Sequence, residues 1–205
     1  MSKATLRDIA IRGKRLFVRV DFNVPLSKAG EVTDDTRISA ALPTISYALQ
    51  EGASVILASH LGRPGGRVDP AFSLRLVAAC LQKLLGQPVR LAPDCVGAET
   101  EALAQALAPG EVLLLENLRF HAEEEANDPA FAQALARLGN VFVNDAFGAA
   151  HRAHASTAGM AAYLQPAVAG LLMEQEITYL RRSQSTRSSP WSPSWAGPKS
   201  PTKFP

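Results

Sequence analysis

Short apolar runs recur along the chain and contain few charged residues. They span 16–20, 54–58, 89–91, 112–115 and 141–143. Nearly continuous apolar character over so few residues is typical of strands that are buried on both faces of a parallel sheet. The pattern therefore predicts five buried strands.

Between and after these runs, apolar residues recur at helical spacing. Pro43 falls inside the first such pattern and predicts a kink or a late helix start. Ser73 is a predicted helix cap, and Asp128 followed by Pro129 predicts another helix start. Strands alternating with helices predict an α/β fold, specifically a three-layer, Rossmann-like domain with a mostly parallel sheet and helices on both faces. The predicted helices span 38–49, 74–84, 98–108, 129–138, 160–163 and 173–182.

The last 23 residues, 183–205, have a different composition from the rest. They include seven serines and five prolines without apolar periodicity, which predicts an irregular or disordered tail. The formal net charge of the chain is +2, but Arg187, Lys199 and Lys203 lie in this tail with no acidic residue. The remainder carries a net charge of −1, which argues against a nucleic-acid partner.

Composition also bears on the cellular compartment and on metals. The longest apolar runs, such as 112–115, are far shorter than the about 20 residues of a membrane span. Residues 1–5 lead into polar sequence without a secretory signal, so we expect a cytoplasmic protein. Cys80 and Cys95 do not have a metal-binding spacing and are interpreted as reduced thiols. No metal site is predicted.

Polar residues cluster directly after four of the predicted strands. Because ligands of open α/β sheets bind beyond the carboxyl ends of the strands, these clusters form a candidate site. Other interpretations stay open: Asp21 and Asn23 as turn formers, Arg63 and Arg119 as solvated loop charges, and His60 as a core histidine. The clusters are 21–25, 59–64, 116–121 and 144–157.

These clusters contain the side chains expected to bind a small polyanion that carries a hydroxyl group. Guanidinium groups match phosphate and carboxylate in a bidentate manner, and Asp21 and Asn23 suit a hydroxyl. His151 and His154 lack further ligands for zinc, and we expect them to shape their loop. We find no nucleophile–base pair and no glycine-rich nucleotide fingerprint. The predicted cationic residues are Arg37, His60, Arg63, Arg119 and Arg152.

Four motifs resemble the N-terminal domain of the phosphoglycerate kinase family. They are RVDFNVP at 19–25, SHLGRP at 59–64, ENLRF at 116–120 and NDAFGAAHRAH at 144–154. They occur in the family's order and at compatible spacing, and the resemblance covers about residues 5–182. Motifs of this length do not co-occur by chance.

The resemblance implies a glycolytic kinase that transfers a phosphoryl group reversibly between ATP and the carboxylate of 3-phosphoglycerate, giving ADP and 1,3-bisphosphoglycerate. Arg37 would also stabilise charge on the transferring phosphoryl group, as a catalytic residue. No general base is required, because the acceptor carboxylate is already ionised. The substrate residues implied by the motifs are Asp21, Phe22, Asn23, Arg37, His60, Leu61, Gly62, Arg63, Arg119 and Arg152.

The chain also departs from the family pattern. We expect residues 1–170 to form the substrate-binding domain and 171–182 to begin an interdomain helix. The second domain of the family, which binds Mg-ATP or Mg-ADP, is missing from the sequence. Residues 183–205 do not follow the pattern, which suggests a C-terminally truncated or frameshifted product. Lys199 and Lys203 keep a spacing similar to that of nucleotide contacts.

Two hypotheses follow for the function of this chain. The first is a phosphoglycerate kinase of which this chain is a part. We expect this part to bind 3-phosphoglycerate or 1,3-bisphosphoglycerate as a monomer, to bind nucleotide poorly and to show no kinase activity. The second is a non-catalytic binding module for small phosphorylated anions. Neither predicts a nucleic-acid or membrane partner.

Overall fold

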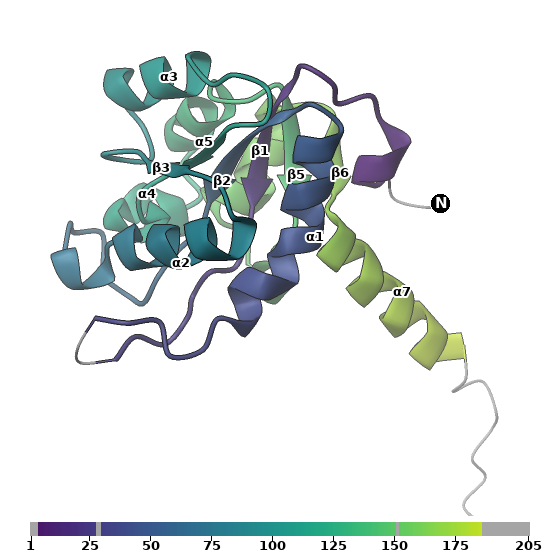
Figure 1. The fold of residues 1–205 in the computed structure, drawn as a ribbon, viewed down its shortest axis with the longest axis horizontal. Helices are drawn as coiled ribbons and strands as arrows, with labels where there is room; N and C mark the ends of the chain where they lie inside the picture. Colours follow the sequence, from purple (N-terminus) through teal and green to yellow (C-terminus); the bar gives the residue numbers. More distant parts are fainter. Residues whose placement is uncertain (1–3, 28–29, 151, 186–205) are drawn as a thin grey trace, which may run out of the picture.

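The computed structural model describes residues 4–27, 30–150 and 152–185. Its strands form one open sheet in which all neighbouring pairs are parallel, in the order β3-β4-β2-β1-β5-β6 (Figure 1). Because parallel neighbours need crossover connections, a helix usually lies between successive strands. The strands are β1 (Arg15–Arg19), β2 (Ser54–Ala58), β3 (Val89–Leu91), β4 (Val112–Leu114), β5 (Val141–Asn144) and β6 (Ala167–Ala169).

Helices cover both faces of the sheet. The first two, α1 and α2, pack on one face, whereas α3, α5 and α6 pack on the other. The last helix, α7, packs beside α1 and extends away from the domain (Figure 1). The helices are α1 (Thr36–Gln50), α2 (Arg75–Leu85), α3 (Ala98–Gln105), α4 (Ala122–Glu125), α5 (Pro129–Ala136), α6 (Met160–Tyr163) and α7 (Leu171–Ser185).

Strand β1 shows how the sequence builds two cores. Leu16 and Val18 are fully buried against the α1 and α2 side, whereas Phe17 is fully buried on the opposite side. Successive side chains of a strand point to opposite faces, so a central strand needs apolar residues at every position. Burial on both faces is therefore the origin of the near-continuous apolar runs. The predicted three-layer α/β fold is confirmed.

The structure differs from the predicted elements at helix α4 (Ala122–Glu125), which was not predicted, and at β6, α1 and the start of α2. It contains β6, a three-residue strand at 167–169 that its short apolar pattern did not reveal. Helix α1 runs from Thr36 through Pro43 to Gln50, so a late helix start was wrong. Ser73 lies two residues before α2, yet its hydroxyl accepts a hydrogen bond from the Arg75 amide at 3.2 Å, as a capping group would.

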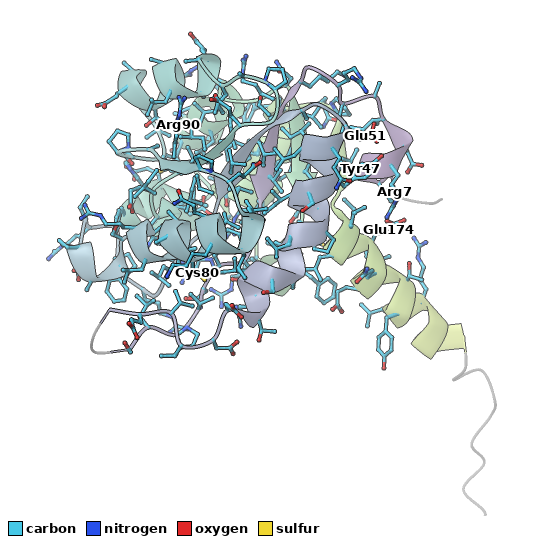
Figure 2. All side chains as sticks on the ribbon, in the orientation of Figure 1. Arg7, Tyr47, Glu51, Cys80, Arg90 and Glu174 are labelled. Carbon is cyan, nitrogen blue, oxygen red and sulfur yellow. The ribbon has the colours of Figure 1, made fainter. Side chains whose placement is uncertain are left out.

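Side-chain contacts hold the start of α7 against the rest of the domain. Arg7 lies between Tyr47 of α1 and Glu174 of α7 (Figure 2). Its guanidinium is 5.4 Å from the centre of the Tyr47 ring, and its Nε is 3.7 Å from a Glu174 carboxylate oxygen. The Leu171 amide donates to the Thr44 hydroxyl at 3.0 Å. No helix in the described part of the chain is long and apolar enough to cross a membrane.

A candidate anion-binding site

A pocket of about 270 Å³ lies at the edge of the sheet where the strands end. The loops after β1, β2, β4 and β5 supply most of its wall, as expected for an open parallel sheet. Arg37 comes from the first turn of α1. The lining residues are Arg19, Asp21, Asn23, Arg37, His60, Gly62, Arg63, Arg119, Gly148, Ala149, Arg152 and His154. Among the described lining residues, five arginines against a single carboxylate make this pocket strongly attractive to an anion.

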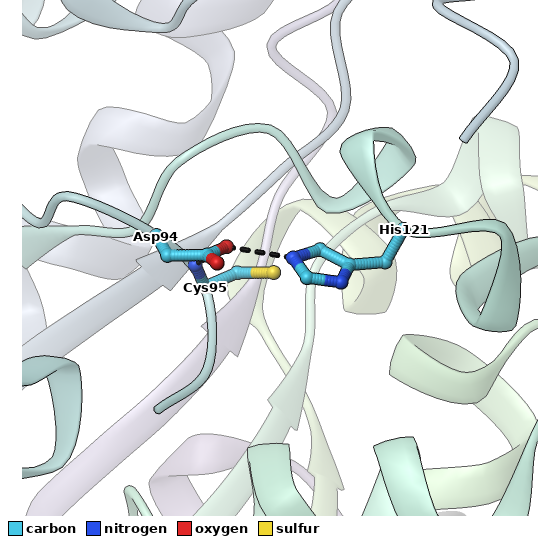
Figure 3. Close-up of side chains that lie close together, drawn as sticks. All are labelled: Asp94, Cys95 and His121. Atoms are coloured by element: carbon cyan, nitrogen blue, oxygen red, sulfur yellow. Dashed lines mark hydrogen bonds and ion pairs between the residues drawn. The ribbon is translucent and has the colours of Figure 1, made fainter. Parts of the chain in front are cut away.

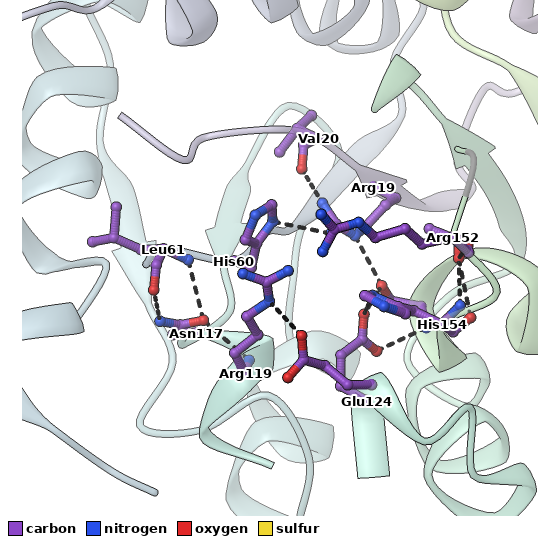
Figure 4. A network of polar contacts seen from close by, with 12 residues as sticks. Arg19, Val20, His60, Leu61, Asn117, Arg119, Glu124, Arg152 and His154 are labelled. Atoms are coloured by element: carbon purple, nitrogen blue, oxygen red, sulfur yellow. Dashed lines mark hydrogen bonds and ion pairs between the residues drawn. The ribbon is translucent and has the colours of Figure 1, made fainter. Parts of the chain in front are cut away.

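Arg19, the last residue of β1, is fully buried at the base of the pocket. Its Nε donates to the Ser156 hydroxyl at 2.8 Å, and its terminal nitrogens contact the Val20 carbonyl and, at 3.3 Å, Nδ1 of His60 (Figure 4). A buried guanidinium is costly unless its donors are paired. These contacts therefore fix Arg19 in one orientation.

Glu124 of α4, which does not line the pocket, offsets the charge of Arg19. Its side chain is 1% exposed and accepts hydrogen bonds from the Ser156 amide at 2.9 Å and the Ser156 hydroxyl at 2.5 Å. One of its oxygens is also 3.8 Å from Nδ1 of His154 (Figure 4). Ser156 thus bridges the carboxylate of Glu124 and the guanidinium of Arg19. This network ties α4 to the end of β1.

Arg37 and Arg119 are also positioned by the protein. Arg37 forms an ion pair with Asp21 at 2.7 Å. Arg119 donates to the Gly62 carbonyl at 2.7 Å, and its Nε is 3.4 Å from Glu125. Because the guanidinium has five donors, these contacts leave further N–H groups for a ligand. The arrangement is pre-organised, which reduces the entropy lost on binding.

His60 and His154, the histidines among the described lining residues, are held neutral at pH 7. Burial, followed by the charges of Arg19 and Arg119, lowers the pKa of His60 to about 2. Burial likewise lowers the pKa of His154, partly opposed by Glu124. Because Arg19 can only donate, Nδ1 of His60 accepts, and its Nε2 carries the proton. His60 therefore serves as a neutral hydrogen-bond donor rather than a proton-transfer group.

The structure brings together eight of the ten residues proposed from the sequence for the substrate. Phe22 and Leu61 are the others, and their side chains lie in the core instead. The proposed nucleotide contacts, Lys199 and Lys203, lie outside the described residues, as does His151. The pocket residues missing from the earlier set are Arg19, Gly148, Ala149 and His154.

The sequence contained one indication that Arg19 lines the pocket: it is a charged residue at the carboxyl end of an otherwise apolar strand. Such a residue cannot face solvent when its strand is central, so it must either pair internally or face a ligand. His154 was expected only to shape its loop. It does so through its amide, which donates to the Thr157 hydroxyl at 3.1 Å, and its side chain also lines the pocket.

The fold and the pocket define an α/β domain suited to a small, multiply charged anion. A family model described as phosphoglycerate kinase matches residues 6–205. The chain belongs to the phosphoglycerate kinase family. This match runs through the tail, beyond residue 182, where the resemblance was expected to end. The tail lies outside the described residues, so its origin in a frameshift stays a prediction.

Individual relatives agree with the family match. The chain is 62% identical over 191 residues to a phosphoglycerate kinase of Desulforudis audaxviator, covering 93% of this chain and 48% of that protein. It is 54% identical over 203 residues to a cytosolic phosphoglycerate kinase of Triticum aestivum, covering 99% of this chain and 50% of that protein. The chain therefore spans about half the length of the curated relatives it matches.

Solved structures confirm the fold. Phosphoglycerate kinase from Coxiella burnetii superposes with a TM-score of 0.80 at 40% identity, covering 89% of this chain and 45% of that one. Phosphoglycerate kinase from Pyrococcus horikoshii superposes with a TM-score of 0.82 at 35% identity, covering 91% of this chain and 47% of that one. The similarity thus corresponds to somewhat less than half of each solved chain.

Proposed function

We propose that this pocket binds 3-phosphoglycerate and that the chain supplies the acceptor-substrate side of a phosphoglycerate kinase. That enzyme transfers a phosphoryl group reversibly between ATP and the carboxylate of 3-phosphoglycerate, giving ADP and 1,3-bisphosphoglycerate. The main support is the convergence of five arginines on one pocket in a chain of this family. An arginine-rich wall suits a ligand with both a phosphate and a carboxylate.

The pocket offers a separate partner for each group of this substrate. The phosphate would bind Arg63, Arg119 and Arg152, and the hydroxyl would bind Asp21 and Asn23. The low exposure of Arg119 supports its assignment to the phosphate. Its side chain is only 7% exposed, so its charge is little screened by solvent. A buried, oriented guanidinium is well suited to hold a phosphate that does not react.

Arg37 is assigned the catalytic role. Its side chain is 53% exposed at the rim, where a second substrate has access, and Asp21 orients its guanidinium. There it would stabilise charge on the phosphoryl group as the group moves to the acceptor carboxylate. A carboxylate needs no base to become a nucleophile, which is consistent with a pocket whose histidines are neutral.

We propose further that the 205-residue chain binds phosphoglycerate but does not catalyse turnover by itself. Residues 1–170 would form the binding domain, and α7, from residue 171, would begin the connection to the part that binds Mg-ATP or Mg-ADP. The support is that the chain spans about half the length of its relatives. We propose a cytoplasmic monomer, in keeping with the cytosolic relative of Triticum aestivum.

Isothermal titration calorimetry with 3-phosphoglycerate tests the binding proposal. Arg63→Ala and Arg119→Ala should each weaken affinity about 10-fold or more, because a charge-assisted hydrogen bond is worth about 1.5–3 kcal/mol. Arg75→Ala, an exposed arginine of α2 outside the pocket, is the matched control and should leave affinity unchanged. Equal affinities for all four proteins would contradict the proposed site.

Two further measurements separate the candidate functions. A generic module for phosphorylated anions should bind 2-phosphoglycerate and inorganic phosphate about as tightly as 3-phosphoglycerate. A phosphoglycerate kinase site should prefer 3-phosphoglycerate, because each pocket group has a fixed partner. A coupled assay with Mg-ATP and 3-phosphoglycerate tests turnover, and clear activity of the pure chain would refute the proposal that it only binds.

A further inference from the structure

A second cluster of chemically reactive side chains lies outside the anion pocket. Asp94 and Cys95 come from the loop between β3 and α3, and His121 immediately precedes α4 (Figure 3). One potential ligand atom from each of the three lies within 4.8 Å of the others. None of the three lines the anion pocket. A carboxylate, a thiol and an imidazole together are typical donors for zinc.

The backbone and neighbouring side chains hold these donors in place. The Thr100 hydroxyl donates to the Asp94 carbonyl at 3.1 Å, which fastens the loop to α3. The His121 ring packs on Phe131 of α5, with 5.2 Å between ring centres. The Cys95 side chain is fully buried and provides a fixed donor at the inner end of the cluster. Cys95 is therefore the fixed donor, to which the more exposed Asp94 and His121 side chains would adjust.

The distances are close to those that a tetrahedral zinc ion requires. Bond lengths of about 2.3 Å to sulfur and about 2.0–2.2 Å to nitrogen and oxygen place neighbouring ligand atoms about 3.4–3.6 Å apart. Here the His121 Nε2 to Asp94 Oδ1 distance is 2.7 Å, and no pair exceeds 4.8 Å. Shifts of about 1 Å by Asp94 and His121 would therefore complete the geometry.

The two donors that must move are partly exposed, and Asp94 would exchange the hydrogen bond that its Oδ1 accepts from the Cys95 amide at 2.6 Å for the metal. The side chains of Asp94 and His121 are 42% and 26% exposed, whereas that of Cys95 is buried. Their exposure also leaves a solvent-facing side for a fourth ligand. The two exposed donors form a hydrogen bond with each other at 2.7 Å, and a metal ion would replace this contact by binding both.

We propose that Asp94, Cys95 and His121 bind one thiophilic divalent cation of the zinc class, with water as the fourth ligand. The cation would join the loop before α3 to the start of α4. On binding, the Cys95 thiol releases its proton to solvent and its sulfur forms the bond to the metal. The neutral His121 ring takes the tautomer with its proton on Nδ1, which frees Nε2 to bind, so one proton leaves for each cation bound. The site is independent of the anion pocket and of the function proposed for it.

Cobalt(II) provides a direct probe of this site, because thiolate coordination gives a sulfur-to-metal charge-transfer absorption and tetrahedral geometry gives strong visible bands. We expect both to appear on titration of the reduced chain and to saturate at one equivalent. Zinc added afterwards should displace the cobalt and remove the bands. Absence of the charge-transfer band, or saturation at a different stoichiometry, would overturn the proposal.

Variants locate the signal. Cys95→Ala should abolish the charge-transfer band, while Cys80→Ala, the matched control on α2 (Figure 2), should leave it unchanged. Asp94→Asn and His121→Gln should each weaken cobalt affinity by more than about 10-fold, the loss that removal of even an outer-shell partner causes. A band that persists in Cys95→Ala or disappears in Cys80→Ala would contradict the assignment.

The unfolding temperature distinguishes loss of a metal ligand from loss of folded structure in the variants. Zinc should raise the unfolding temperature of the wild-type chain, since a ligand that binds only the folded state stabilises it. The same zinc concentration should not raise that of Cys95→Ala or His121→Gln. If the variants unfold cooperatively and respond to zinc as the wild type does, the proposed ligands are wrong.

Discussion

Replacing Glu124 with alanine is expected to destabilise the chain by about 3–5 kcal/mol, the usual cost of leaving a buried charge without its compensating partner. Glu124 is 1% exposed and offsets the charge of the fully buried Arg19, with Ser156 bonded to both. Without the carboxylate, the Arg19 charge loses its principal compensation in the core. Folded chains are stable by only about 5–15 kcal/mol, so this loss is a large fraction of the total.

Two companion variants separate charge from hydrogen bonding. Glu124→Gln removes the charge but keeps the shape and an acceptor for the Ser156 amide, so it should cost less than Glu124→Ala by about 0.5–1.5 kcal/mol, the usual net value of a hydrogen bond. The double variant Arg19→Met/Glu124→Gln should lose less than the sum of the single losses. Each single variant leaves one charge uncompensated, whereas the double variant leaves neither.

Equilibrium unfolding in urea measures these differences, and thermal unfolding provides a check. A loss of 3–5 kcal/mol should lower the unfolding temperature by about 6–20 °C in a chain of this size. Glu123→Ala, the exposed neighbour on α4, is the control and should stay within about 0.5 kcal/mol of the wild type. If Glu124→Ala behaves like Glu123→Ala, the network does not carry the electrostatic role described.

Three further predictions concern stability. Burial raises the pKa of Asp145 above 3.8, so the stability tied to its proton is present at low pH and is lost as pH rises above about 4. Asp145→Asn should therefore gain stability relative to wild type as pH rises through that range in unfolding titrations, and a constant difference would contradict this. The pKa of His60 is lowered to about 2, so the stability that its neutral form contributes is lost as pH falls below 6.5. The free energy of unfolding of the wild type should therefore drop by about 1.5 kcal/mol more than that of His60→Gln between pH 6.5 and 5. Equal drops in the two proteins would refute this prediction. Gly139→Ala would place a Cβ 3.0 Å from that of Phe17 and should cost about 1–3 kcal/mol by urea unfolding, with no loss expected only if β1 shifts freely.

The sequence predicted the parts of the fold that follow from local periodicity. Five strands and the α/β class were visible because central parallel strands are apolar at every position, and Asp128 with Pro129 correctly marked the start of α5. Strand β6 was missed because three residues, Ala167–Ala169, carry too little pattern, and only pairing with β5 defines them. Such an element depends on tertiary context rather than on propensity.

The residues of the candidate site also divide into those that a local sequence pattern reveals and those that depend on tertiary contacts. Residues in loops after strands, such as Arg63 and Arg119, could be identified because the topology brings strand ends together. Arg19 could not be assigned in the same way, because its role depends on Ser156 and Glu124, which are distant in sequence. The cluster that we propose as a metal site was not predicted from the sequence, for a related reason. Its ligands are separated by 26 residues, from Cys95 to His121, and only the packing of two loops joins them.

The central position of β1 has a consequence for synthesis of the chain in the cell. β1 pairs with β2 on one side, but its other edge pairs with β5, where Leu16 lies opposite Val141. At about 5–20 residues per second, a ribosome needs about 6–25 s to make the intervening 125 residues. During that time an apolar strand has an open hydrogen-bonding edge that invites mispairing. Yield in the cell should therefore depend on chaperones that shield nascent chains, even if the finished domain is stable.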